Sequence, residues 1–170
     1  MCEETENYLW AVQDILGHGA TSQVYKAYEK NNGMLVAAKV YQLTSNSRSA
    51  YGGGGNGNRE RDFRPLLERE MDILKAANHE NIVRYIAVEP VILSNSDQSR
   101  GAREALFIEY CNGGSLQNVL EQPQNRYGLA EDEFMLVFRH IVNALKYLHN
   151  KNTVRPRNLL FFKSHLISII

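Results

Sequence analysis

Three short β-rich runs separated by tight turns occupy the first quarter of the chain. The runs lie at 8–16, 23–29 and 35–41, with a glycine-containing turn at 17–22 and Lys-Asn-Asn-Gly at 30–33. Consecutive strands joined by such short turns pair as antiparallel neighbours, whereas parallel strands need a longer crossover. The chain is therefore predicted to begin with an antiparallel meander.

The remainder mixes helices and strands. Apolar spacing of three and four predicts helices at 65–78, 115–121 and 131–150, and apolar runs predict strands at 82–93 and 105–110. The longest helix should bury a broad face that contains Phe134, Val137, Phe138, Ile141, Val142, Leu145 and Leu148. Two polar stretches, a Gly-rich one at 44–64 and another at 94–104, are expected to be flexible insertions and not domain boundaries.

Composition bounds the class of protein. The 170 residues suit one domain, and 44% hydrophobic with 22% charged residues is ordinary globular composition. The formal net charge of zero gives no general attraction to nucleic acid. Cys2 and Cys111 form no CxxC pair, which argues against a disulfide scaffold or a cysteine zinc site. With no secretory signal pattern and no apolar run long enough to span a membrane, we expect a cytoplasmic protein.

A glycine loop lies in the first predicted turn. Residues 17–24 read Gly-His-Gly-Ala-Thr-Ser-Gln-Val and fit the pattern G-x-G-x-x-S-x-V. Glycines allow backbone N–H groups to approach a phosphate without a Cβ in the way. Two glycines in a hairpin more often serve the turn alone. Neither a Walker A lysine nor a following helix is present, which excludes the P-loop and Rossmann patterns.

A lysine stands inside the apolar third strand. Lys39 follows Val-Ala-Ala at 36–38, and a buried lysine is costly unless it is paired or reaches solvent from an edge strand. The helix at 65–78 offers Glu68, Glu70 or Asp72 as a partner. A glycine loop, a strand lysine and a helix carboxylate in this order are far more specific than any one of them.

With these residues in view, the chain resembles the N-lobe of a protein kinase. Further matching segments are His-Glu-Asn-Ile-Val at 79–83, Phe-Ile-Glu-Tyr-Cys at 107–111 and Gly-Gly-Ser-Leu at 113–116. The resemblance is closer still to the IκB-kinase-related serine/threonine kinases, the TANK-binding kinase and IKK-epsilon group. The segments at 9–10, 14–21, 78–83, 121–123 and 127–134 carry it, and it covers about residues 8–160 apart from the insertions.

The resemblance implies an α+β fold, with a five-stranded antiparallel sheet and one helix forming a kinase-like N-lobe. Only the first helices of the C-lobe would follow. The expected partial kinase domain is 8–170, divided into an N-lobe at 8–110, the start of the C-lobe at 111–160 and an unmatched tail at 161–170. The tail is either a buried strand or sequence unrelated to the family.

The resemblance also implies roles for individual residues in binding ATP. Gly17 and Gly19 would cover the phosphates, within a loop completed by His18, Ala20, Thr21, Ser22 and Gln23. Lys39 would hold the α- and β-phosphates and pair with Glu70. Adenine would lie between Leu16, Val24 and Ala37, beside Ile108 as gatekeeper, and would bond to the backbone of Glu109 and Cys111. The Cys111 thiol itself is more simply a buried small hydrophobe.

The chain departs from the kinase pattern after the long helix. The family's catalytic loop reads H-R-D-x-x-x-x-N, and counting back from Asn158 places Thr153 where the aspartate should be. About four further residues after Val154 would be needed to restore the spacing, and no Asp is present in either alignment. The D-F-G motif is also not found before Ile170, so the Mg²⁺ site that the family implies is incomplete and we expect no metal role for Asn158.

Three functional expectations follow. The family implies a serine/threonine kinase with protein substrates and signalling adaptors, in innate-immune or NF-κB-type signalling, but inactive in the sequence as written. The alternative is a non-catalytic, pseudokinase-like short isoform that binds nucleotide or partner proteins. The third is a fragment that does not fold alone, because the apolar face of the helix at 131–150 would be left partly exposed.

Overall fold

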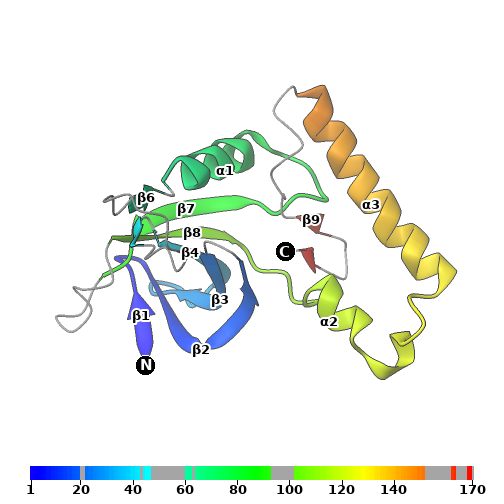
Figure 1. Ribbon diagram of the computed structural model, residues 1–170, viewed down its shortest axis with the longest axis horizontal. Coiled ribbons are helices and arrows are strands. Elements are labelled where there is room, and N and C mark those ends of the chain that lie inside the picture. The colour runs from blue at the N-terminus through cyan, green and yellow to red at the C-terminus, as the bar shows by residue number, and fades with distance from the viewer. Residues whose placement is uncertain are drawn as a thin grey trace, which may run out of the picture.

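A six-stranded antiparallel sheet forms the N-terminal part of the computed structural model, which describes residues 1–19, 22–42, 44–46, 60–62, 64–92, 102–151, 162–163 and 168–169. The strand order is β1-β2-β3-β4-β8-β7 (Figure 1). The strands are β1 (Cys2–Glu4), β2 (Tyr8–His18), β3 (Ser22–Glu29), β4 (Leu35–Gln42), β7 (Tyr85–Pro90) and β8 (Arg103–Glu109). The α+β fold, with its kinase-like sheet and accompanying helix, is confirmed.

The sheet has one strand more than the five expected. β1 pairs antiparallel with β2, with Cys2 opposite Ala11. The guanidinium of Arg103 donates to both carboxylate oxygens of Glu3, at 2.9 and 3.1 Å, and both side chains are about nine-tenths buried. The Ile92 N–H also donates to the Glu4 carbonyl oxygen at 2.9 Å. Polar contacts therefore secure this strand, which explains why apolar spacing did not predict it.

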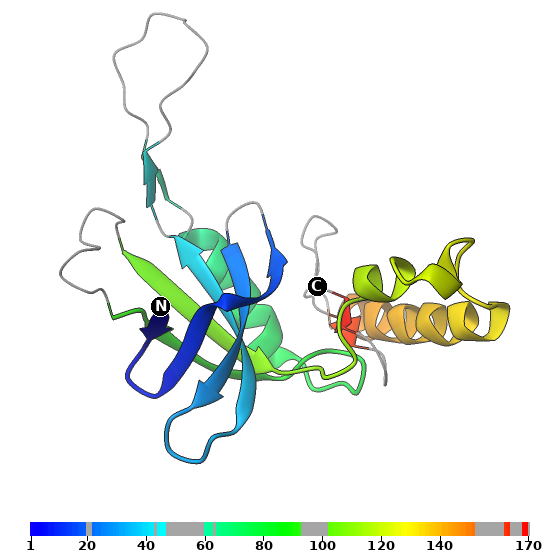
Figure 2. The same cartoon turned by 90° about the horizontal axis from the view of Figure 1, so that it is seen from below.

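The two faces of the sheet carry separate apolar clusters, as the period of two along a strand requires. On β4, Val36, Ala38 and Val40 join one cluster, which includes Trp10 and Phe107. Ala37 and Tyr41 join the other, together with Leu67, Ile73 and Leu74 of helix α1 (Arg64–Ala76). Lys39 alternates onto this second face. Helix α1 lies against one side of the sheet (Figure 2), the side whose apolar cluster includes its Leu67, Ile73 and Leu74.

The two polar insertions differ in part from the prediction. The ends of the Gly-rich stretch pair as short antiparallel strands, β5 (Thr44–Asn46) and β6 (Glu60–Asp62), and its centre lies outside the described residues. In the second stretch, Arg103 and Glu104 already belong to β8. Arg103 pairs with Gln42 across the sheet and bonds Glu3, which draws these polar residues into the strand.

The elements that follow β8 in the chain lie beside the sheet, near the C-terminal end of β8 (Figure 1). Helix α2 (Leu116–Leu120) begins after Ser115, whose hydroxyl accepts from the Asn118 N–H at 3.1 Å. A 3-10 turn (Pro123–Asn125) leads to α3 (Glu131–Asn150). Two short strands, β9 (Phe162–Lys163) and β10 (Ser168–Ile169), pair with each other within residues 161–170. No helix in the described part of the chain is long and apolar enough to cross a membrane.

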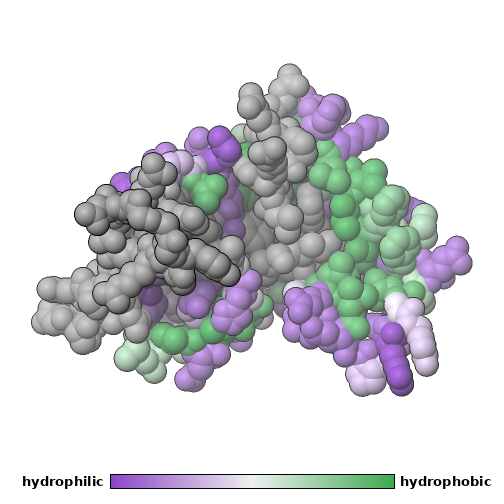
Figure 3. Space-filling model, in the orientation of Figure 1, coloured by the Kyte–Doolittle hydropathy of each residue, from purple (hydrophilic) through white to green (hydrophobic). Residues whose placement is uncertain are grey.

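The long helix α3 has the predicted bounds but a narrower buried face than expected. Val137, Ala144 and Leu148 are buried. Phe134 and Phe138 are 53% and 50% exposed, and Val142 and Leu145 are also exposed, so their predicted burial is wrong. Apolar residues gather on the visible surface where the helix lies (Figure 3). The expectation that this face is partly exposed is confirmed.

Candidate functional site

An ion pair joins the sheet to helix α1 on the covered face. The Nζ of Lys39 lies 2.9 Å from Glu70 Oε1 and 2.9 Å from Oε2. The two side chains are only 14% and 15% exposed. Glu68 and Asp72, the other two carboxylates considered as partners, lie on the exposed side of the helix. The expected pair is present, whereas its role toward a nucleotide stays a prediction.

The surroundings of Lys39 act on the pKa of its ammonium in two opposite directions. Burial lowers the pKa of its ammonium, while the Glu70 charge and hydrogen bond act in the opposite direction. A buried ammonium is tolerated where a carboxylate accepts its hydrogen bonds. The pair therefore keeps a cation on a largely apolar sheet face.

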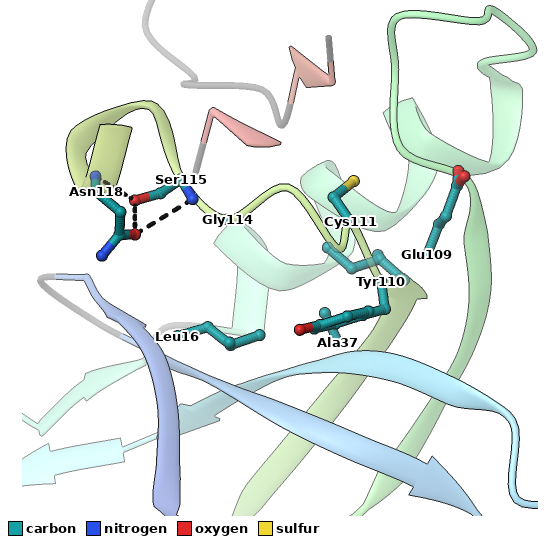
Figure 4. Close-up of a pocket in the computed structure, with 9 residues that line it drawn as sticks. Leu16, Ala37, Glu109, Tyr110, Cys111, Gly114, Ser115 and Asn118 are labelled. Carbon is teal, nitrogen blue, oxygen red and sulfur yellow. Dashed lines mark hydrogen bonds between the residues drawn. The ribbon is translucent and has the colours of Figure 1, made fainter. Parts of the chain in front are cut away.

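A pocket with an apolar floor and a polar rim opens on the same face of β4 as Lys39. It is lined by Leu16, Ala37, Ile108, Glu109, Tyr110, Cys111, Gly114, Ser115 and Asn118 (Figure 4). Ala37 and Lys39 lie on the same face of β4, two residues or about 7 Å apart along the strand. The pocket and the Lys39 side chain therefore share one face of β4.

Five of the predicted site residues line the pocket, and four lining residues were missed. The missed ones are Tyr110, Gly114, Ser115 and Asn118. Tyr110, Gly114 and Ser115 come from the segment that connects β8 to α2, and Asn118 lies in α2 itself. The Gly-Gly-Ser-Leu sequence at 113–116 was part of the family resemblance, which gave it no role. The capping hydrogen bond between Ser115 and Asn118 fixes this rim (Figure 4). The Ser-x-x-Asn capping pattern at 115–118 was the sequence signal that could have located this rim.

The glycine loop joins β2 to β3 above the same face. Gly17 pairs with Val24 and His18 with Gln23, while the Gly19 N–H donates to the Ser22 carbonyl oxygen at 2.8 Å. A Cβ on Gly19 would lie 3.2 Å from both the backbone oxygen and the hydroxyl of Ser22, so glycine permits this tight approach. Ala20 and Thr21 lie outside the described residues.

Val24 and Glu109 are two of the residues predicted to contact adenine, and of these Glu109 lines the pocket. Val24 is 2% exposed and belongs to the apolar cluster that includes Ala37 and Ile108. The Glu109 N–H donates to the Arg84 carbonyl oxygen at 2.9 Å. The backbone donor of Glu109 is thus already used, and its carbonyl oxygen, which can accept two bonds, is what this residue could offer a ligand.

Tyr41 is a contact of the ion pair that sequence reasoning missed. Its hydroxyl donates a hydrogen bond to Glu70 Oε2, and its ring centroid lies 5.1 Å from Lys39 Nζ. Residues two apart in a strand share a face, so the position of Tyr41 relative to Lys39 was the available signal.

The described residues contain no group of three or more His, Cys, Asp or Glu side chains arranged to hold a metal ion. Thr153 and Asn158, on which the expectations about the catalytic loop and metal depend, lie outside the described residues. The described geometry combines an apolar slot suited to a flat ring with a nearby ammonium suited to an anion.

Comparisons with known proteins agree with this arrangement. A family model described as "Protein kinase domain" matches residues 10–170. Inhibitor of nuclear factor kappa-B kinase subunit epsilon from Mus musculus is 37% identical over 163 residues, which cover 93% of this chain and 20% of that protein. Mitogen-activated protein kinase kinase kinase 19 from Homo sapiens is 31% identical, with 97% of this chain and 11% of that protein covered.

A third relative, Serine/threonine-protein kinase 10 from Danio rerio, is 28% identical over 87% of this chain and 12% of its own length. The chain thus spans a fifth or less of the length of these relatives. The resemblance to the IκB-kinase-related group is confirmed by the first of them. On the match of residues 10–170, this chain belongs to the protein kinase domain family, and its relatives are serine/threonine protein kinases.

Proposed function

We propose that the chain binds ATP, with adenine in the apolar pocket and phosphates toward Lys39. Leu16, Ala37 and Ile108 supply apolar contacts for the ring. The carbonyl oxygen of Glu109 and the backbone of Cys111 supply polar contacts at the pocket edge. The Lys39 ammonium attracts the α- and β-phosphates while Glu70 holds it in place.

The Lys39–Glu70 pair is the single observation that carries this proposal. An apolar pocket alone suits many ligands, whereas a largely buried ammonium at 2.9 Å from its carboxylate adds a specific preference for an anion. Its place on β4, on the same face as Ala37, allows one ligand to reach both features.

We predict that Lys39→Met loses the phosphate-dependent part of ATP binding. ATP at ten times its Kd stabilises a protein by about 1.4 kcal/mol, which raises Tm by about 3–6 °C for a chain of this size. The methionine keeps the length of the side chain but removes the charge that attracts phosphate. Thermal unfolding with ATP should therefore show a shift in the wild type that falls in Lys39→Met to the level given by adenosine.

Adenosine is the control for this measurement, because it fills the apolar pocket without phosphates. We expect it to shift both proteins equally. An ATP shift of the same size in wild type and Lys39→Met would contradict the proposed site, and so would a folded wild type that shows no shift with ATP.

We further propose that the polypeptide as written binds nucleotide without transferring phosphate, because Thr153 stands where the family's catalytic aspartate would be. The name of the Mus musculus relative, which includes nuclear factor kappa-B kinase, motivates our proposal that this chain belongs to cytoplasmic NF-κB-type signalling, with protein substrates and adaptors. Mg²⁺ is the metal that kinases use with ATP, and Asn158, which matches a metal-binding residue of the family, lies outside the described residues.

A second candidate function is non-catalytic binding of partner proteins. The exposed apolar residues of α3, foremost Phe134 and Phe138, favour it, because contiguous exposed apolar side chains commonly mark interaction surfaces. The double substitution Phe134→Ser and Phe138→Ser should abolish co-purification of a partner from the source cells without changing the circular dichroism spectrum. Capture that is unaffected by the substitutions would contradict a partner site on α3.

A further inference from the structure

Glu70 accepts hydrogen bonds from two residues of β4, and only one of them is the expected lysine. Lys39 Nζ bonds both carboxylate oxygens, and the Tyr41 hydroxyl bonds Oε2. Lys39 and Tyr41 alternate onto the same sheet face, two residues apart, so both reach the same carboxylate on α1. The helix is therefore attached to the sheet by a triad of side chains.

Tyr41 also contacts the other member of the pair. The Lys39 ammonium lies 5.1 Å from the Tyr41 ring centroid, within the range of a cation–π contact. The ring is 2% exposed and packs in the cluster shared by α1 and the sheet, so it has little freedom to move. Tyr41 thus touches Glu70 through its hydroxyl and Lys39 through its ring.

The Tyr41 hydroxyl is suited to act as a lasting donor. Burial first, and then the Glu70 charge, raise the pKa of Tyr41 above its usual value, so the hydroxyl keeps its proton at all physiological pH values. A hydroxyl that donates to a carboxylate forms a charge-assisted hydrogen bond, which is stronger than a neutral one.

We propose that Tyr41 is a positioning residue that holds Glu70, and with it helix α1, against Lys39, so that the Lys39 ammonium is set for nucleotide phosphate. This rests on the proposed ATP-binding function and adds to it a residue that contacts no ligand itself. Without the hydroxyl, Glu70 keeps one of its two β4 partners and α1 gains freedom to move away from the sheet.

Tyr41→Phe tests the proposal, because it keeps the buried ring and removes only the hydroxyl. We expect a Kd for ATP that is about threefold to tenfold weaker and an unchanged Kd for adenosine, both measured by titration calorimetry of the full chain. We also expect hydrogen exchange of the α1 amides to quicken by about threefold or more, since the loss of this bond favours opening of the helix. A residue that acted only through packing would move neither measurement selectively.

Tyr8→Phe is the matched control. Tyr8 is also buried, at 5% exposure, but it lies in the cluster on the opposite face, where its ring stacks on Phe107 with centroids 3.8 Å apart. This variant loses a tyrosine hydroxyl without touching the triad, so ATP affinity and α1 exchange should match the wild type.

The two measurements separate the proposal from the function on which it rests. A measurable ATP affinity that is equal in wild type and Tyr41→Phe overturns the positioning role. Unchanged α1 exchange overturns it as well. A wild type that binds no ATP, with α1 exchange still faster in Tyr41→Phe than in Tyr8→Phe, contradicts the ATP proposal but supports the attachment of α1 by Tyr41.

Discussion

Glu70→Ala should destabilise the folded chain by about 3 kcal/mol and remove most of its affinity for ATP. Breaking a buried ion pair by deleting one partner costs about 3–5 kcal/mol, because the remaining charge stays buried without compensation. We expect the lower end of this range because the two side chains are still 14% and 15% exposed, which lets water reach the Lys39 ammonium. The loss extends to Tyr41, whose hydroxyl would lose its acceptor within the core.

Urea unfolding followed by circular dichroism measures this loss. Glu68→Ala is the matched control, because Glu68 lies on the exposed side of the same helix and its removal should change stability by no more than about 0.5 kcal/mol. If Glu70→Ala were as stable as Glu68→Ala, the pair would contribute nothing to attaching α1.

A double variant separates the two consequences. Lys39→Met combined with Glu70→Leu removes both charges and fills their volume with apolar groups, which is often neutral for stability. We therefore expect the double variant to regain most of the stability that Glu70→Ala loses while still failing to bind ATP through its phosphates. The contribution of the Lys39–Glu70 pair to stability would then be separable from its contribution to nucleotide affinity.

The sequence was sufficient for those features that follow from local spacing. The meander, helix α1 and the bounds of α3 follow from periods of 2 and 3.6. The Lys39–Glu70 pair was predicted because a lysine in an apolar strand needs a partner, and the family resemblance selected Glu70 from three nearby carboxylates. Each of these features depends on a few neighbouring residues and on a single physical rule, either a hydrophobic period or the need of a buried charge for a partner.

The features that the sequence did not reveal depend on contacts between distant segments. β1 is secured by Glu3 and Arg103, which are 100 residues apart, and neither residue shows an apolar pattern. Tyr41 lies at the end of an apolar strand, and nothing in the sequence beyond its shared face with Lys39 indicates that its hydroxyl bonds Glu70 of α1. The buried face of α3 was predicted from the apolar period of the helix alone, whereas burial depends on which elements pack against it. Phe134 and Phe138 remain about half exposed.

The polypeptide should show no Mg-ATP-dependent phosphoryl transfer, even if it binds ATP well. In kinases an aspartate of the catalytic loop accepts and orients the proton of the substrate hydroxyl, and such a general base contributes about 10²–10⁴ in rate. Counting back from Asn158, the family resemblance places Thr153 at the matching position, and a threonine hydroxyl is too weakly basic at neutral pH to accept that proton. The restored spacing, which would need about four further residues, supplies no carboxylate either.

Incorporation of labelled phosphate into the chain itself and into a mixture of serine- and threonine-containing peptides measures this activity. Lys39→Met serves as the comparison, since incorporation seen equally with both proteins comes from a contaminating kinase. Incorporation that requires Lys39 would overturn the prediction and would mean that another group near the pocket acts as the base. ATP binding without incorporation would instead show that the described site retains nucleotide recognition, which depends on the sheet and α1, separately from catalysis, which depends on the segment after α3.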